Sequence, residues 1–142
     1  MIVIVDASVA VLWLVAQERS DSAQALLESI HELVALDLTR LEVMSAVLRL
    51  TRSKRLSQLE ANVGIERFRR VPMRLLPASD YAADAYAIAQ RHGGSVYDAC
   101  YIALARSLDA PLVTDDEAMA KTAETVGVAV HRASQGFAAL LD

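Results

Sequence analysis

Short apolar runs alternate with helical patterns along the whole chain, and this alternation restricts the fold more than any other feature. The runs expected to form strands are 2–5, 33–36, 73–76, 112–113 and 128–130. The segments expected to form helices, each with a capping residue or a Gly or Pro stop, are about 6–15, 20–30, 39–54, 57–70, 79–91, 98–109 and 116–125. Strands that alternate with helices form a parallel sheet covered on both faces. We therefore predict an α/β fold, a three-layer α/β/α sandwich around a mainly parallel sheet.

Chain length and composition predict one compact domain over residues 1–142. Hydrophobic residues make up 54 % of the 142 residues, which describes a folded protein with a sizeable core. No apolar run reaches the roughly 18 residues that a membrane span needs, so we expect a soluble protein without a membrane partner. Cys100 is the lone cysteine, which excludes an internal disulfide, favours the cytoplasm and suits a buried small hydrophobe.

Charge is distributed unevenly along the chain. The net charge is −4, but the stretch 49–74 carries eight bases against two acids, and the rest carries six bases against sixteen acids. A basic stretch of this kind can follow a polyanion, which makes its first bases candidate RNA contacts: Arg49, Arg52, Lys54 and Arg55. The alternative is a solvated helical hairpin with ordinary surface arginines.

Four acids stand at strand ends or within helical patterns: Asp6, Glu42, Asp98 and Asp116. The carboxyl ends of parallel strands gather in one crevice, where ligands usually bind. Carboxylates that meet there are suited to hold a hard divalent cation. Each acid also has an ordinary structural reading, because aspartate is a preferred helix cap and an acid suits the first turn of a helix.

Glu42 illustrates the structural alternative most clearly. It follows Thr39 by three residues, the spacing of a capping box that would open the third helix. We expect the inner face of this helix to carry Leu41, Met44, Val47 and Leu48.

Two hydroxyls and one further acid lie beside the strand-end aspartates. Ser8 and Thr114 could orient a carboxylate, although capping explains both equally well. Asp115, next to Asp116, adds like charge that a bound cation would relieve. We take all three as supporting residues, with the role of Asp115 left open.

Four segments in order resemble the successive motifs of PIN-domain proteins, and more narrowly of the VapC-type ribonuclease toxins of toxin–antitoxin pairs. They are IVDASV at 4–9, TRLEVMSAVL at 39–48, VYDACYIALA at 96–105 and LVTDDEAM at 112–119. The match spans essentially the whole chain. Each motif alone is weak, but the four in sequence are specific.

The resemblance implies a PIN-like fold and an Mg²⁺- or Mn²⁺-dependent ribonuclease that is the toxin of a type II pair. The family's acids then fall on Asp6, Glu42, Asp98 and Asp116, with Ser8 and Thr114 in its hydroxyl positions. We expect Asp6, Asp98 and Asp116 to bind the metal, and Glu42 to bind metal or orient the attacking water. The implied partners are an RNA substrate, a cognate antitoxin and a second copy in a homodimer. The basic stretch 49–74 could contact the RNA or equally bind an acidic segment of the antitoxin.

Two other functions remain open at the level of sequence. One is a PIN-like module that binds RNA or protein without catalysis. The other is a phosphoacceptor signalling domain, which also gathers acids and Mg²⁺ at strand ends. The latter needs a late lysine directly after a strand, whereas Lys121 lies within a helical pattern.

Overall fold

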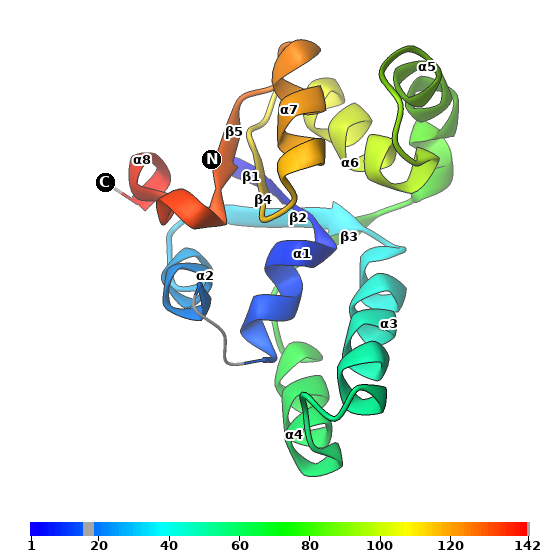
Figure 1. The fold of residues 1–142 in the computed structure, drawn as a ribbon. Coiled ribbons are helices and arrows are strands. Elements are labelled where there is room, and N and C mark those ends of the chain that lie inside the picture. The colour runs from blue at the N-terminus through cyan, green and yellow to red at the C-terminus, as the bar shows by residue number, and fades with distance from the viewer. Residues whose placement is uncertain (16–18, 142) are drawn as a thin grey trace.

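The computed structural model describes residues 1–15 and 19–141, which form a sheet of five strands with helices between them (Figure 1). Along the chain the elements are β1 (Ile2–Val5), α1 (Ala7–Ala10), η1 (Val11–Trp13), α2 (Ser20–Leu27), β2 (Glu32–Leu36), α3 (Thr39–Arg52), α4 (Gln58–Phe68) and β3 (Arg74–Leu76). They continue as η2 (Ala78–Tyr81), α5 (Ala82–His92), α6 (Val96–Ser107), β4 (Leu112–Thr114), α7 (Glu117–Thr125), β5 (Val130–Arg132), η3 (Ala133–Gln135) and α8 (Ala138–Leu141), where η marks a 3-10 helix.

The strands form one parallel sheet in the order β3-β2-β1-β4-β5. The chain moves outward from β1 through β2 to β3 and then returns to place β4 on the other side of β1. The strand order therefore reverses between β1 and β4, where Val5 pairs with Val113. A crevice outside the carboxyl ends of the strands at such a point is the usual ligand site of open α/β sheets.

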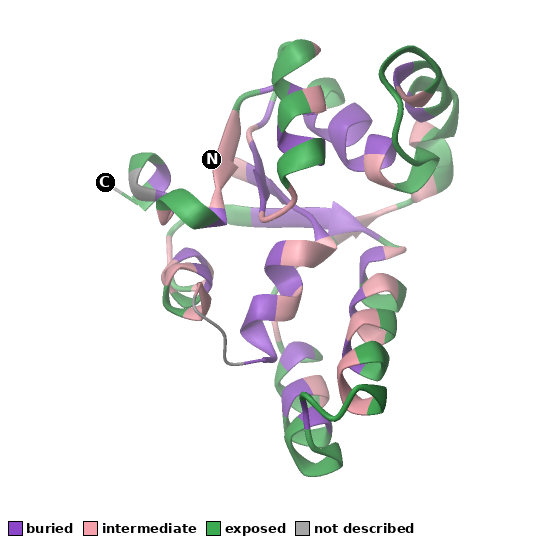
Figure 2. Ribbon diagram, in the orientation of Figure 1, coloured by how far each residue is buried: buried purple, intermediate pink, exposed green. Residues whose placement is uncertain are grey.

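Helices cover both faces of the sheet, and the strands alternate accordingly. On β1, Val3 and Val5 belong to the core beneath α1 to α4, whereas Ile4 belongs to the core beneath α5, α6 and α7. Figures 1 and 2 show these two helix layers on opposite sides of the buried strands. The period of two residues in a strand places alternate side chains on opposite faces. The three layers that the sequence predicts are thus present.

The inner face of α3 differs from the one predicted. Val43 and Val47 are buried and Met44 is half-buried, but Leu41 is 72 % exposed and Leu48 is 46 % exposed. The helix packs against α1 and α4 along one side, so the side chains one residue further round face solvent. The prediction was wrong for these two leucines.

Several boundaries also differ from those predicted. The first helix is a short α-helix that continues as a 3-10 turn, α2 ends at Leu27 instead of near Ile30, and the last strand begins at Val130 rather than two residues earlier. The chain then continues into η3 and α8, which the sequence did not suggest. No helix in the described ranges is long and apolar enough to cross a membrane.

Candidate functional site

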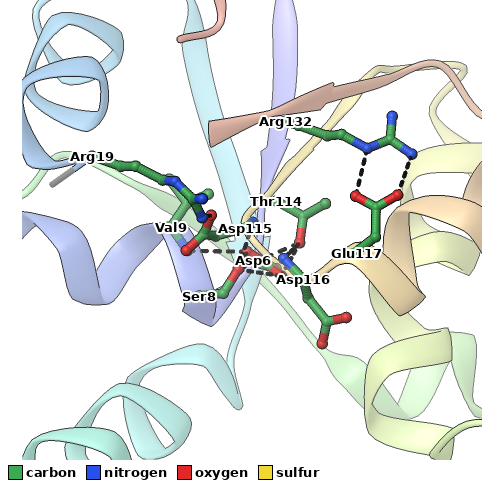
Figure 3. A network of polar contacts seen from close by, with 9 residues as sticks. All are labelled: Asp6, Ser8, Val9, Arg19, Thr114, Asp115, Asp116, Glu117 and Arg132. Atoms are coloured by element: carbon green, nitrogen blue, oxygen red, sulfur yellow. Dashed lines mark hydrogen bonds and ion pairs between the residues drawn. The ribbon is translucent and has the colours of Figure 1, made fainter. Parts of the chain in front are cut away.

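Asp6 lies directly after β1 and is 1 % exposed. Its Oδ1 accepts a hydrogen bond from the backbone N–H of Val9 at 3.1 Å, so it caps α1 as its structural reading predicts. The Ser8 hydroxyl approaches Oδ1 at 2.7 Å and Oδ2 at 2.9 Å, and Thr114 Oγ1 donates to Oδ2 at 2.6 Å (Figure 3). Burial nevertheless raises the pKa of Asp6 to about 7, against the lowering effect of these donors.

The two hydroxyls that hold Asp6 also join the ends of β1 and β4. Ser8 Oγ accepts a hydrogen bond from the backbone N–H of Asp115 at 2.8 Å, and Thr114 Oγ1 accepts one from the N–H of Asp116 at 3.0 Å. Because each hydroxyl accepts from the β4 side and donates to Asp6, the aspartate has a defined position between the two strand ends. Ser8 and Thr114 therefore lie where the sequence places them, in contact with the first acid.

Asp116 caps α7, as Asp6 caps α1. Its Oδ1 accepts a hydrogen bond from the N–H of Met119 at 3.0 Å. The side chain is half-buried and its negative charge raises the pKa of both Asp6 and Asp98. Two capping aspartates at neighbouring strand ends thus repel each other across the point where the strand order reverses.

Glu42 lies in the first turn of α3, but it does not complete a capping box. Leu38 occupies the N-cap position with a helical backbone and makes no side-chain cap hydrogen bond. The carboxylate of Glu42 instead accepts a hydrogen bond from the hydroxyl of Tyr101 at 2.6 Å. Burial raises the pKa of Glu42, and the charge of Asp98 adds to this effect. The predicted capping box is therefore wrong, because the acid turns toward α6.

Asp98 lies in the first turn of α6 without capping it. Ser95 is the N-cap residue, and its hydroxyl accepts a hydrogen bond from the N–H of Asp98 at 3.0 Å. The capping reading of Asp98 is thus wrong, although its place in the first turn suits the helix dipole. Burial raises the pKa of Asp98, and the charge of Asp116 raises it further.

The structure brings the four predicted acids together. Asp6, Glu42, Asp98 and Asp116 line one pocket of about 310 Å³, with the side chains of Ser8, Arg49 and Tyr101 among its other walls. These acids come from the end of β1, from α3, from α6 and from the start of α7. Segments that are distant in sequence therefore supply one acidic crevice at the carboxyl edge of the sheet.

The chemistry of this pocket fits a hard divalent cation. Burial raises the pKa of Asp6, Glu42 and Asp98, so ionising all of them calls for a compensating positive charge. Carboxylate oxygens are the ligands that Mg²⁺ accepts, with waters completing its shell. Within residues 1–15 and 19–141, no group of three or more His, Cys, Asp and Glu is already arranged to hold an ion, so water ligands or side-chain movements would complete the shell.

Asp115 does not line this pocket. Its carboxylate forms an ion pair with Arg19, and Figure 3 shows it directed toward Arg19 while the Asp116 carboxylate points away. The backbone of Asp115 still contacts the site through its N–H bond to Ser8. The neighbouring acids thus have different surroundings, which the sequence left open.

The four bases predicted to contact RNA also differ in whether they line the pocket. Arg49 lines the acidic pocket from α3. Arg52, Lys54 and Arg55 are exposed at and beyond the end of α3 and do not line it. Only the first of the four bases is therefore part of the pocket.

Tyr101 is the residue of the pocket that sequence reasoning passed over as a site residue. It is 1 % exposed and contacts Glu42 directly. Its position three residues after Asp98 in α6 places both on one helix face, and this spacing is the signal that could have indicated it. Cys100, one residue earlier, is buried and unpaired as predicted.

The family model of the PIN domain matches residues 3–125, which is most of the chain. This chain is a PIN-domain protein. Ribonuclease VapC3 of Pyrobaculum aerophilum is 35 % identical to the PIN-domain chain over 124 residues, which cover 85 % of the chain and 94 % of that protein. The resemblance to VapC-type members, first read from four motifs, is thereby confirmed.

Solved structures show the same fold. PAE2754 from Pyrobaculum aerophilum matches the PIN-domain chain with a TM-score of 0.71 at 22 % identity, over 97 % of the chain and 88 % of that protein. VapBC2 from Rickettsia felis, bound to a DNA fragment from their promoter, matches with a TM-score of 0.64 at 15 % identity, over 93 % of the chain and 98 % of that chain. The predicted α/β/α sandwich with a parallel sheet is confirmed.

Proposed function

We propose that this PIN-domain protein is a metal-dependent endoribonuclease and the toxin of a type II toxin–antitoxin pair. The observation that carries the proposal is the convergence of Asp6, Glu42, Asp98 and Asp116 on one pocket at the carboxyl edge of the sheet. A relative that is 35 % identical and is named a ribonuclease supports the choice of substrate class.

Each residue of the pocket has a proposed role that follows from its position. Asp6, Asp98 and Asp116 would hold Mg²⁺ or Mn²⁺, and Glu42 would bind the ion or orient the attacking water. The bound ion supplies charge stabilisation at the phosphodiester and lowers the pKa of a water. Ser8 and Thr114 fix the Asp6 carboxylate through the hydrogen bonds described above.

Arg49 is the base best placed to contact the RNA backbone. It lines the same pocket as the acids, so a phosphate that enters the pocket would meet a guanidinium as well as the ion. Arg52, Lys54 and Arg55 extend this positive charge over the exposed end of α3. We propose that they guide the RNA rather than contact the scissile phosphate.

We also propose that the protein forms a homodimer and binds a cognate antitoxin. Family membership supports both partners, and the likeness in fold to VapBC2 is in keeping with them. A small protein encoded beside this chain, co-purifying with it and suppressing RNA cleavage, is the expected antitoxin.

RNA cleavage by the Asp6→Asn variant tests the proposed function. Asparagine can still accept the hydrogen bond from Val9 and cap α1, so the fold is expected to remain intact. In the presence of Mn²⁺ we expect at least about 100-fold slower cleavage, because a lost ligand removes several kcal/mol of charge stabilisation. Asp84→Asn, an exposed change on α5, is the matched control and should cleave as the unmodified protein does. Undiminished cleavage by folded Asp6→Asn protein would contradict the proposal, as would intact RNA when the unmodified protein is titrated with Mn²⁺.

A further inference from the structure

A chain of hydrogen bonds runs from the end of β2 to the acidic pocket. The backbone N–H of Leu36 donates to Thr39 Oγ1 at 3.1 Å, Thr39 Oγ1 lies 2.7 Å from the hydroxyl of Tyr101, and that hydroxyl donates to Glu42 Oε1 at 2.6 Å. The three side chains come from the first turn of α3 and from α6. This Leu36–Thr39–Tyr101–Glu42 relay therefore connects a central strand, two helices and one of the four acids.

The relay has one direction while Glu42 is ionised. A carboxylate only accepts, so the single hydroxyl hydrogen of Tyr101 points to Glu42. The oxygen of Tyr101 must then accept from Thr39, whose own oxygen accepts from the Leu36 N–H. Each donor is polarised by the one before it, which strengthens the final bond to the carboxylate.

Burial makes this arrangement costly to disturb. Thr39 is 0 % exposed and Tyr101 is 1 % exposed, and among the described residues the partners of both hydroxyls are the members of the relay. Removing one member leaves a buried polar partner without a hydrogen bond. The buried hydroxyls of Thr39 on α3 and Tyr101 on α6 thus lead to one carboxylate, that of Glu42, which lines the pocket.

The contact engages only one oxygen of Glu42. Tyr101 binds Oε1, and within the described residues Oε2 has no protein hydrogen bond. Fixing Oε1 restricts rotation of the carboxylate of Glu42, which lines the pocket together with Asp6, Asp98 and Asp116.

We propose that Thr39 and Tyr101 are positioning residues that hold Glu42 in its working orientation. The inference rests on the proposed metal-dependent cleavage and extends it to two residues that lie outside the acid set. Partners that orient a ligand carboxylate usually change metal affinity or activity by about 10-fold to 100-fold when removed.

The first experiment compares Tyr101→Phe with Tyr86→Phe. Both lose one hydroxyl, but Tyr86 is 60 % exposed on α5 and outside the pocket. Mn²⁺ affinity is measured by electron paramagnetic resonance without RNA, and kcat and KM are measured with RNA. We expect Tyr101→Phe to weaken Mn²⁺ binding and to lower kcat by about 10-fold, with KM changed less than about twofold. Loss of kcat alone also supports the proposal and assigns Glu42 to the water. Unchanged affinity and kcat would overturn it, even if the thermal midpoint falls.

Changes at Thr39 test whether the effect passes along the relay. Thr39→Ser keeps the hydroxyl and should behave as the unmodified protein, whereas Thr39→Val should reproduce part of the Tyr101→Phe defect. The double variant Tyr101→Phe with Thr39→Val should be no worse than Tyr101→Phe, since both act through one carboxylate. Defects that multiply in the double variant would show independent structural roles and contradict the relay. If Tyr101→Phe does not fold, Thr39→Val alone tests the relay by the same measurements of Mn²⁺ affinity and kcat.

The two proposals fail in different ways. If the unmodified protein leaves RNA intact with Mn²⁺, the proposed function fails, and Mn²⁺ affinity alone then decides the relay: a loss in Tyr101→Phe supports it and no loss overturns it. If the unmodified protein cleaves RNA and Asp6→Asn does not, the function stands, and a fully active Tyr101→Phe variant with unchanged Mn²⁺ affinity overturns only the relay.

Discussion

The two halves of the acidic pocket are held in different ways. Asp6 and Asp116 follow neighbouring strands, and each is tied to backbone N–H groups of the helix it caps. Glu42 and Asp98 come from α3 and α6, and side-chain hydroxyls are the partners of their carboxylates: Tyr101 donates to Glu42, and a hydrogen bond from Ser95 lowers the pKa of Asp98. The strand half is fixed by the sheet, whereas the helix half depends on how two helices pack.

This difference indicates which of the four acids adjusts most when a ligand binds. Both carboxylate oxygens of Asp6 are engaged by buried donors, so its rotation would break several bonds. Rotation of the Asp98 carboxylate would disturb a single side-chain contact, with Ser95. We infer that the strand half and Glu42 provide the fixed part of the site, and that Asp98 adjusts most when an ion binds.

The largest effects are expected when one acid of each half is neutralised. Asp116→Asn and Asp98→Asn should each slow Mn²⁺-dependent RNA cleavage about 100-fold or more, through the loss of several kcal/mol of charge stabilisation. Neither should unfold the protein, because asparagine still caps α7 and Ser95 caps α6. Cleavage assays with circular dichroism of each variant check this. Full activity in the Asp98→Asn variant would exclude Asp98 from the metal site.

Metal and pH should act together on stability. The pKa of Asp6 is about 7 in the folded protein and 3.8 is its ordinary value, so the folded state binds this proton more tightly. Metal-free protein therefore loses up to about 4 kcal/mol of stability as pH rises from about 4 to about 7, and the loss persists above pH 7. A bound cation offsets the charge, so stabilisation by Mn²⁺ over EDTA should be larger at pH 8 than at pH 5. Urea unfolding measures it, and equal stabilisation at both pH values would contradict the account.

Thr114→Val should lower the stability of the protein, because Thr114 joins the two strand ends of the strand half. The change removes the donor to Asp6 Oδ2, in buried surroundings, and the acceptor for the Asp116 N–H, in partly buried surroundings. At pH 8 we expect a loss of about 2 kcal/mol in the free energy of unfolding, with Thr114→Ser largely intact. Thr51→Val, whose hydroxyl donates to Leu48 O in an exposed place, is the control and should change stability by less than about 1 kcal/mol. Equal losses for both threonines would argue against a special role for the strand ends.

Arg49→Gln should affect RNA binding more than chemistry. If Arg49 contacts a phosphate from within the pocket, its loss should weaken RNA binding several-fold. It should also reduce the slope of the logarithm of the binding constant against the logarithm of salt concentration by about one. Arg67→Gln on the exposed surface of α4 is the matched control. Fluorescence anisotropy at several salt concentrations measures both. The same loss in both variants would assign the effect to overall charge.

The smallest effect is expected at Asp115. Its carboxylate pairs with Arg19 outside the pocket, in a partly exposed ion pair of the kind worth about 0–1 kcal/mol. Asp115→Asn should cleave RNA within about threefold of the unmodified protein, in contrast to Asp116→Asn. A loss as large as that of Asp116→Asn would place Asp115 among the ligands and alter the description of the strand half.

The positions of Asp6 and Asp116 could be predicted from the sequence, because each aspartate follows a strand. An aspartate directly after a β-branched run must lie at the end of a strand, and parallel strands bring such ends together. Capping, which competed with metal binding as an explanation of Asp6 and Asp116, turns out to be compatible with it, since each carboxylate caps a helix and lines the pocket.

The helix half was less predictable because it depends on packing between distant helices. Thr39 and Glu42 have the spacing of a capping box, yet both hydroxyl and carboxylate turn toward Tyr101, some sixty residues later. The exposure of Leu41 and Leu48 follows from the same cause, since the sequence pattern does not say which side of α3 meets α1 and α4.

The most direct test of a single site built from both halves is the position of a bound ion. A crystal soaked in Mn²⁺ and measured at the manganese absorption edge should show an anomalous peak in the pocket, within ligand distance of carboxylate oxygens of Asp6, Asp98 and Asp116. A peak elsewhere, or none at this pocket when the protein cleaves RNA in the same Mn²⁺ concentration, would contradict the account.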